Sequence, residues 1–233
     1  MGRVGTSLPT KEVLDFGLAH ARARDAVHIE LDKGTLEAAI QAEGFLVMRA
    51  SSLAVNRSDY LLRPDLGRRL DEASKALIHS RNSEKPIDLL IVIGDGLSSL
   101  AVQRHALPVL MAIRKRIPSD WHIGPIILAS QARVALSDEI GETLNARMVA
   151  ILIGERPGLS SPDSLGIYLT YRPRVGLTDA NRNCISNIRP EGLGYDLAAD
   201  KLAWLAKEAL RMKVSGVSLK DESDIKQVTN DQA

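Results

Sequence analysis

Two short polar segments follow directly after apolar runs, and their residue types suit the binding of a polar or charged ligand. Residues 154–158 (GERPG) present the carboxylate of Glu155 beside the guanidinium of Arg156 on a stiff turn of glycine and proline. Residues 94–99 (GDGLSS) begin like a dinucleotide-binding fingerprint, but Ser99 stands where the pattern G-x-G-x-x-G requires its third glycine, and no lysine supports a P-loop. Together they predict the edge of a binding site without defining a nucleotide motif.

Each segment also has a plainer interpretation. Glu155 and Arg156 are compatible with a solvated ion pair at a turn, which would contribute little free energy. The 94–99 segment is compatible with a tight strand-to-helix turn in which Ser98 caps the helix that follows. Ligand binding and simple turn geometry therefore both stay open for these segments.

Nucleophilic and metal chemistry find little support in the chain. Cys184 is the single cysteine, which excludes an intrachain disulfide and fits a reducing compartment. No histidine can be placed beside it, so a buried thiol that packs as a small hydrophobe is favoured over a nucleophile. The histidines lack the spacing of a metal site, and none lies in an Asp-x-His-x-x-Gly segment; they are His20, His28, His79, His105 and His122. No catalytic set assembles from the sequence.

Composition excludes several classes of protein. Of the 233 residues, 45% are hydrophobic and 25% are charged, as in ordinary globular domains. Thirty basic and 29 acidic residues give a net charge of +1, so nucleic acid is not an expected partner. No stretch approaches the roughly 20 apolar residues of a membrane helix. We expect a cytoplasmic protein that does not span a membrane.

The first third of the chain, residues 1–84, predicts a mostly helical region. Apolar residues at helical spacing indicate a helix over 11–28 with Thr10 as its N-cap. A short helix at 35–43, a strand at 45–53 and a helix at 63–81 that begins near Pro64 follow in that order.

From residue 87 the pattern changes to short apolar runs separated by helices, as in parallel strands covered on both faces. The expected strands are 87–96, 124–130, 148–155 and 166–173, and the expected helices are 97–116, divided or kinked at Pro108, 137–146, with Ser137 as N-cap, and 196–213. This order predicts an α/β fold in which a helical N-terminal region precedes a doubly wound, Rossmann-like, mostly parallel sheet. The expected domain spans residues 85–218, and 219–233 form a polar tail.

In such a sheet, ligands bind beyond the carboxyl ends of the strands, where loops and helix N-termini converge. Residues 94–99, 130–134 and 154–158 each follow one of the expected strands. We therefore expect these three segments to lie along one edge of the sheet and to form the walls of a cleft.

Several long segments resemble one known family, the small subunit of adenosylcobalamin-dependent ethanolamine ammonia-lyase. They are YLLRPDLGRRL (60–70), GDGLSSLAV (94–102), RVALSDEIGE (133–142), LIGERPGLSSPDSLGIYLTYRPR (152–174) and DANRNCISNIRPEGLGYDLAA (179–199). The similarity extends over nearly the whole chain, and the run from Gly154 to Ile188 is far more specific than any three-residue motif.

The resemblance implies a subunit that holds adenosylcobalamin against a large TIM-barrel subunit, for the radical conversion of ethanolamine to acetaldehyde and ammonia. It implies cofactor contacts at Val134, Glu155 and Cys184, no catalytic residue on this chain, and inactivity of this chain alone. The missing Asp-x-His-x-x-Gly segment implies that cobalamin keeps its own base on the cobalt. A higher hetero-oligomer in the cytoplasm is expected, with enclosure in a bacterial microcompartment left open.

Two other classes of function remain from the residues themselves. One is a self-sufficient nucleotide-binding α/β enzyme that uses the 94–99 loop, although it lacks an identifiable catalytic residue. The other is a structural interaction subunit whose cleft binds nothing.

Overall fold

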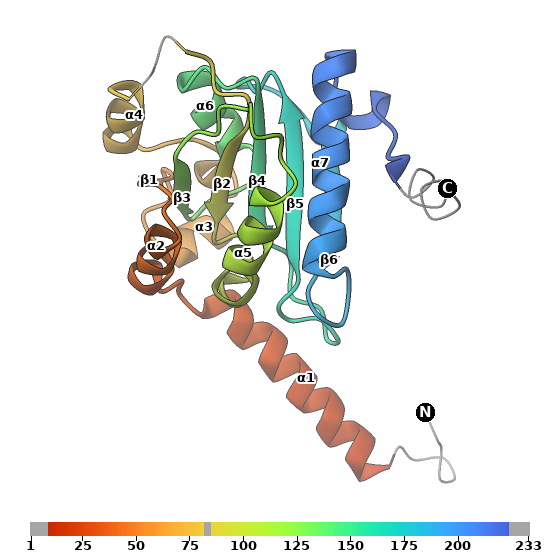
Figure 1. The fold of residues 1–233 in the computed structure, drawn as a ribbon. Coiled ribbons are helices and arrows are strands. Elements are labelled where there is room, and N and C mark those ends of the chain that lie inside the picture. Colours follow the sequence, from red (N-terminus) through yellow and green to blue (C-terminus); the bar gives the residue numbers. More distant parts are fainter. Residues whose placement is uncertain (1–8, 82–84, 224–233) are drawn as a thin grey trace, which may run out of the picture.

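The protein is an α/β fold with a helical N-terminal region, as the sequence predicts. The structure, a computed structural model, describes residues 9–81 and 85–223 (Figure 1). The strands are β1 (Val47–Ser51), β2 (Leu90–Gly94), β3 (Ile126–Ser130), β4 (Met148–Gly154), β5 (Leu165–Tyr171) and β6 (Arg182–Ile188). The α-helices are α1 (Thr10–His28), α2 (Lys33–Ala42), α3 (Arg57–Leu62), α4 (Glu72–His79), α5 (Ser99–Arg114), α6 (Leu136–Thr143) and α7 (Tyr195–Met212).

One mixed sheet runs through the molecule in the order β1-β3-β2-β4-β5-β6. The first four strands of this order pair in parallel, and β5 is antiparallel to both β4 and β6. The chain leaves β2 for β3 on one side and then returns to β4 on the other side. Such a reversal opens a crevice at the carboxyl ends of the two central strands, β2 and β4.

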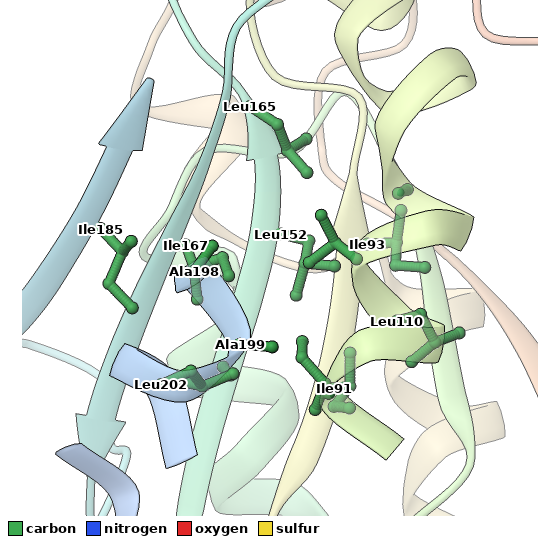
Figure 2. Close-up of a cluster of buried hydrophobic side chains, with 14 of the residues drawn as sticks. Ile91, Ile93, Leu110, Leu152, Leu165, Ile167, Ile185, Ala198, Ala199 and Leu202 are labelled. Atoms are coloured by element: carbon green, nitrogen blue, oxygen red, sulfur yellow. The ribbon is translucent and has the colours of Figure 1, made fainter. Parts of the chain in front are cut away.

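The two faces of the sheet bury alternate residues of the same strands. Ile91, Ile93 and Leu152 point toward α5 and α7, where they meet Leu110 and Leu202 (Figure 2). The opposite face packs against α4 and α6, and its buried residues include Leu90, Val92, Ile127, Val149, Ile151, Ile78 and Ile140. Because both faces of the central strands are covered, these strands appear in the sequence as continuous apolar runs.

The strand β6 was not predicted, and its burial explains why. Ile185 and Ile188 are buried on the side of α7, whereas Cys184 and Ser186 on the alternate positions are exposed. A strand covered on one face alternates between apolar and polar residues, so it produces no continuous apolar run. Within residues 9–81 and 85–223, no helix therefore covers the other face of this part of the sheet.

Several expected helix boundaries were wrong. The predicted helix at 63–81 is instead α3, a 3₁₀ turn at Leu66–Arg68 and α4, with Pro64 in the connection. Pro9 and Ala135, rather than Thr10 and Ser137, precede α1 and α6.

The α5 helix is not divided at Pro108, because nine of its residues are buried against the sheet and its neighbouring helices. In the N-terminal region, β1 pairs with β3 and so joins the same sheet. The division of the chain at residue 84 stays a prediction, and the predicted tail falls within the described residues only as far as 223.

The helix α1 projects away from the rest of the molecule (Figure 1). Ala26 is its one buried residue, and its exposed side chains include Val13, Leu14, Phe16 and Leu18. None of the helices within residues 9–81 and 85–223 combines the length and apolar character needed to span a bilayer.

Gly154→Ala tests the close approach between the end of β4 and the loop after β2. A Cβ at position 154 would lie 2.0 Å from the backbone oxygen of Ser98, which cannot move without displacing α5. We expect the free energy of unfolding to fall by about 1–3 kcal/mol or more, as in overpacked cores. The measurement is urea denaturation followed by circular dichroism. The control is Gly17→Ala in α1, where a Cβ meets nothing within 4 Å and no loss is expected.

Candidate functional site

The carboxylate of Asp95 organises the edge of the sheet at the end of β2. It accepts hydrogen bonds from the backbone N–H groups of Gly96 (2.9 Å), Gln131 (2.8 Å) and Ala132 (2.9 Å). The Arg57 guanidinium lies 4.0 Å from it. Burial raises the pKa of Asp95, and these N–H donors together with Arg57 act in the opposite direction. The loops after β2 and β3 are thus joined by one buried side chain.

The 94–99 loop is packed too tightly to cradle a phosphate. Gly96 has φ +59, and a Cβ there would lie 2.2 Å from the backbone oxygen of Gly154. Leu97 donates its N–H to that same oxygen at 2.9 Å. A phosphate-binding loop needs free N–H groups, but here Asp95 and Gly154 already accept them. The plainer interpretation is confirmed: Ser98 caps α5 through a hydrogen bond to the N–H of Ala101 at 3.3 Å.

A cleft of about 430 Å³, which we call the central cleft, opens at the carboxyl edge of the sheet between the end of β4 and the segment that leads into α6. Its lining residues are Tyr60, Gly96, Leu97, Arg133, Val134, Ile153, Gly154, Glu155, Arg156 and Tyr168. All three predicted segments reach the carboxyl edge of the sheet, and two of the three predicted contact residues, Val134 and Glu155, line this cleft.

Glu155 is half-buried, and its hydrogen bonds connect the end of β4 to residues in or next to β5 and β6. Its Oε2 atom accepts hydrogen bonds from the Ser164 hydroxyl (2.6 Å) and from the N–H of Asn187 (3.2 Å). Its own N–H donates to the backbone oxygen of Ser164 at 3.0 Å. Among the described residues, Arg156 has no ion-pair partner, so the predicted Glu155–Arg156 pair is wrong. Arg156 instead extends, exposed, along the cleft wall.

Cys184 lies one strand away from the central cleft. It sits directly opposite Tyr168 in the pairing of β5 with β6, and Tyr168 lines the cleft. The expectation of a buried thiol was wrong, because the residue is exposed on the face of β6 that none of the described helices covers. Desolvation of the thiol nonetheless raises the pKa of Cys184, while the Tyr168 hydroxyl opposes this rise. A thiol with a raised pKa is poorly suited to act as a nucleophile.

Tyr60 and Arg133 shape the cleft and were not among the predicted contacts. Tyr60 is fully buried, and its hydroxyl donates to the backbone oxygen of Ala132 at 3.1 Å. The Arg133 guanidinium stacks 4.2 Å from the centre of the Tyr60 ring and donates to the Tyr60 backbone oxygen at 3.0 Å. Arg133 lay within the predicted segment 130–134, so its charge was an available signal. Tyr60 comes from the N-terminal region, and the sequence carried no signal of its position.

The loop between β4 and β5 is bound to the N-terminal half of α5 by a hydrogen bond and an ion pair. Ser98 donates its hydroxyl to the backbone oxygen of Pro162 at 2.9 Å, and Arg104 pairs with Asp163 at 2.7 Å. His105 lies behind them, with its Nε2 atom 3.5 Å from Asp163. Burial lowers the pKa of His105, against the opposing effect of Asp163. This histidine contacts Asp163 and Tyr195 and does not line the central cleft.

Other features of the described chain do not form a catalytic centre. Within residues 9–81 and 85–223, no group of three or more His, Cys, Asp or Glu side chains could hold a metal ion. An apolar pocket of about 470 Å³ lies near the amino ends of β1 and β3, lined by Phe45 and Trp121 among others. It is at the opposite edge of the sheet from the strand-end segments. The central cleft therefore remains the candidate site.

Asp95→Asn tests whether this carboxylate holds the edge together. The amide keeps one acceptor oxygen, but its NH₂ group would face a backbone N–H and leave a buried donor unsatisfied. We expect the free energy of unfolding to fall by about 1–3 kcal/mol, measured by urea denaturation. Asp120→Asn is the matched control, because Asp120 is exposed, and it should change nothing. Equal stability of the two variants would contradict the role assigned to Asp95.

Comparison with known proteins agrees with the resemblance read from the sequence. Residues 1–220 match the ethanolamine ammonia-lyase light chain family. The ethanolamine ammonia-lyase small subunit of Pseudomonas paraeruginosa is 54% identical over 234 residues, covering 99% of this chain and 86% of that protein. The proteins of the same name from Ralstonia nicotianae and Pseudomonas putida are 54% and 53% identical, over 97% and 99% of this chain and 84% and 86% of their own lengths. This chain belongs to the ethanolamine ammonia-lyase light chain family.

Proposed function

We propose that this chain holds adenosylcobalamin at the carboxyl edge of its sheet, against a large TIM-barrel subunit that converts ethanolamine to acetaldehyde and ammonia. The observation that carries the proposal is the central cleft, where Val134 and Glu155 lie together and Cys184 lies one strand away. When bound, adenosylcobalamin supplies the radical by homolysis of its cobalt–carbon bond. This chain binds and orients the cofactor and contributes no catalytic residue.

The residues around the cleft fit an amide-bearing corrin. Val134 offers an apolar contact at the start of the α6 region, and Glu155 offers carboxylate oxygens to amide N–H or hydroxyl donors. The Glu155 side chain is already positioned by Ser164 and Asn187, so binding costs little further ordering. Cys184 adds a neutral thiol on the exposed face of β6. The site is thus a prearranged cradle.

The size of the cleft supports the need for a second subunit. Pockets of about 300–1,000 Å³ enclose drug-sized ligands, and a cobamide is much larger than such a ligand. A cleft of about 430 Å³ can hold only part of it. The remaining surface of the cofactor, including the adenosyl group, must be covered by the partner. The chain is accordingly one member of a hetero-oligomer and inactive alone.

The histidines support a base-on cofactor. None of the five histidines, all of which lie within the described residues, lines the central cleft. No imidazole of this chain is therefore available to replace the cofactor's own base as a ligand of cobalt. The proposal includes a cytoplasmic location for the enzyme, because a lone unpaired cysteine suits a reducing compartment. Enclosure in a bacterial microcompartment stays open.

The alternative of a self-sufficient nucleotide-binding enzyme has less support. The N–H groups of Gly96, Gln131 and Ala132, which a phosphate would need at this edge, already donate to Asp95. A carboxylate at this position would also repel a phosphate.

Glu155 variants test cofactor binding. Glu155→Ala removes the acceptor oxygens, which should cost about 1–3 kcal/mol, or roughly 5-fold to 150-fold in adenosylcobalamin affinity. Glu155→Gln keeps one acceptor oxygen and should lose less. The measurement is an absorbance titration of the enzyme assembled with its large subunit.

Glu191→Ala, at an exposed glutamate, is the control and should leave the affinity unchanged. Because Glu155 also anchors Ser164 and Asn187, the unfolding of each variant is measured separately. If the folded and assembled Glu155→Ala enzyme bound adenosylcobalamin with unchanged affinity, residues 154–158 would have only a structural role as a turn.

The helix α1 is the strongest candidate for contact with the large subunit. Its C-terminal end is held at the carboxyl edge of the sheet, because Arg57 donates to the backbone oxygens of Val27 (2.7 Å) and Gly96 (2.8 Å). From that edge it extends beyond the body (Figure 1), and several of its apolar side chains are exposed. A subunit that covers the central cleft would also meet α1.

Leu14→Ser combined with Leu18→Ser tests this contact. The two residues lie one helical turn apart and are 67% and 49% exposed, so the fold of the chain should be preserved. We expect association with the large subunit to weaken by roughly 10-fold or more, as for hot-spot residues, in size-exclusion and titration measurements. The control is Glu12→Ser on the opposite side of the helix. Wild-type association of the double variant would exclude this face from the interface.

A further inference from the structure

A second cleft adjoins the central cleft and has a different chemical character. It has a volume of about 490 Å³, and Arg133 and Val134 line both clefts. One wall is formed by residues 64–69, and the other by residues 175–179, which precede β6. We call it the arginine cleft, because four of its lining residues are arginines: Arg68, Arg69, Arg133 and Arg182.

Two of these arginines are neutralised by carboxylates. Arg182 is buried in the floor, where it pairs with Asp138 and, at 3.1 Å, with Asp179. Arg69 forms a two-pronged pair with Glu139, with N–O distances of 3.0 and 3.2 Å. Lys75, whose Nζ atom lies 3.8 Å from Glu139, supplies the third positive charge opposite these three carboxylates, so the paired groups leave little net charge of their own.

The other two arginines have no carboxylate partner among the described residues. Arg133 is fixed by the Tyr60 ring and backbone oxygen, and its Nε atom is buried without a hydrogen-bond partner. Its N–H donates to the backbone oxygen of Gly67 at 2.8 Å, and a Cβ at Gly67 would come within 2.8 Å of the Arg133 side chain. Arg68 is exposed on the adjoining wall. The cleft therefore carries two uncompensated guanidinium groups next to the proposed corrin site.

We propose that the arginine cleft binds the phosphodiester of the cofactor's nucleotide tail, with Arg68 and Arg133 as its contacts. The proposal rests on the proposed function. The side-chain amides of the corrin are neutral, whereas the phosphodiester of the tail carries a single negative charge that two guanidinium groups can hold by charge-assisted hydrogen bonds. Arg133 and Val134 line both clefts, so the clefts adjoin at these residues, and a ligand that extends past them can contact both.

The test compares two ligands of the enzyme assembled with its large subunit. Adenosylcobalamin has the nucleotide tail, and adenosylcobinamide has the same corrin without the phosphate and base. Arg68→Ala should weaken adenosylcobalamin binding by roughly 10-fold to 100-fold, as expected for loss of a charged hydrogen bond, and leave adenosylcobinamide binding unchanged. Arg68→Lys keeps the charge and should lose less. Arg63→Ala is the control, because Arg63 pairs with Asp65 outside the cleft and should affect neither ligand.

Each other outcome counts against a specific statement. Equal weakening of both ligands, or no weakening of either, by Arg68→Ala would overturn the phosphodiester site while leaving cofactor binding in place. Failure of the wild-type assembly to bind adenosylcobalamin would overturn the proposed function and this inference together. Inorganic phosphate serves as a third probe. If it binds beside adenosylcobinamide in an Arg68-dependent manner without weakening adenosylcobalamin, the cleft is a site for free phosphate and the assignment to the tail is wrong.

Discussion

The buried carboxylate of Asp95 is the interaction on which this edge of the molecule depends. It joins the turn after β2 to the turn after β3, and Arg57 extends the connection from this carboxylate to the end of α1. Burying a carboxylate costs free energy, but this cost is offset when its oxygens accept several hydrogen bonds from backbone N–H groups. Without it, the N–H groups of two loops and a buried guanidinium would all need new partners.

This arrangement also determines where a ligand can lie. In many open α/β sheets the turn after the first central strand receives a phosphate, but here Asp95 fills that position. The space that remains lies between the β4 end and the start of the α6 region, beside strands β5 and β6 that lack a helix on that face. A ligand at this edge therefore rests on side chains and on an exposed sheet surface, which suits a broad, flat molecule.

The exposed surfaces have a common physical explanation if a partner covers them. Three features are exposed in the isolated chain: one face of β6, the central cleft and the apolar side chains of α1. Exposing such surfaces to water does not stabilise an isolated chain, and they are typical of binding sites. A single large partner on the carboxyl edge would contact the central cleft and α1, and its contacts would also exclude water from a ligand bound in the cleft. In the function we propose, this chain would position the cofactor and the partner would carry the catalytic residues.

The sequence alone determined the elements whose signals are local. Continuous apolar runs identified the central strands and placed the segments that follow them, 130–134 and 154–158, along one edge. The resemblance to a known family singled out Val134 and Glu155 within these segments, and both line the central cleft. Local signals failed where packing overrides them, as at Pro108 inside α5, and where a strand is covered on one face, as at β6. The tertiary structure decided everything that joins distant segments: Tyr60 beneath Arg133, 73 residues later, and the contact of Glu155 with Asn187, 32 residues later. The exposure of Cys184 also belongs to this group, because burial is a property of neighbours from other parts of the chain, which the types of adjacent residues do not encode.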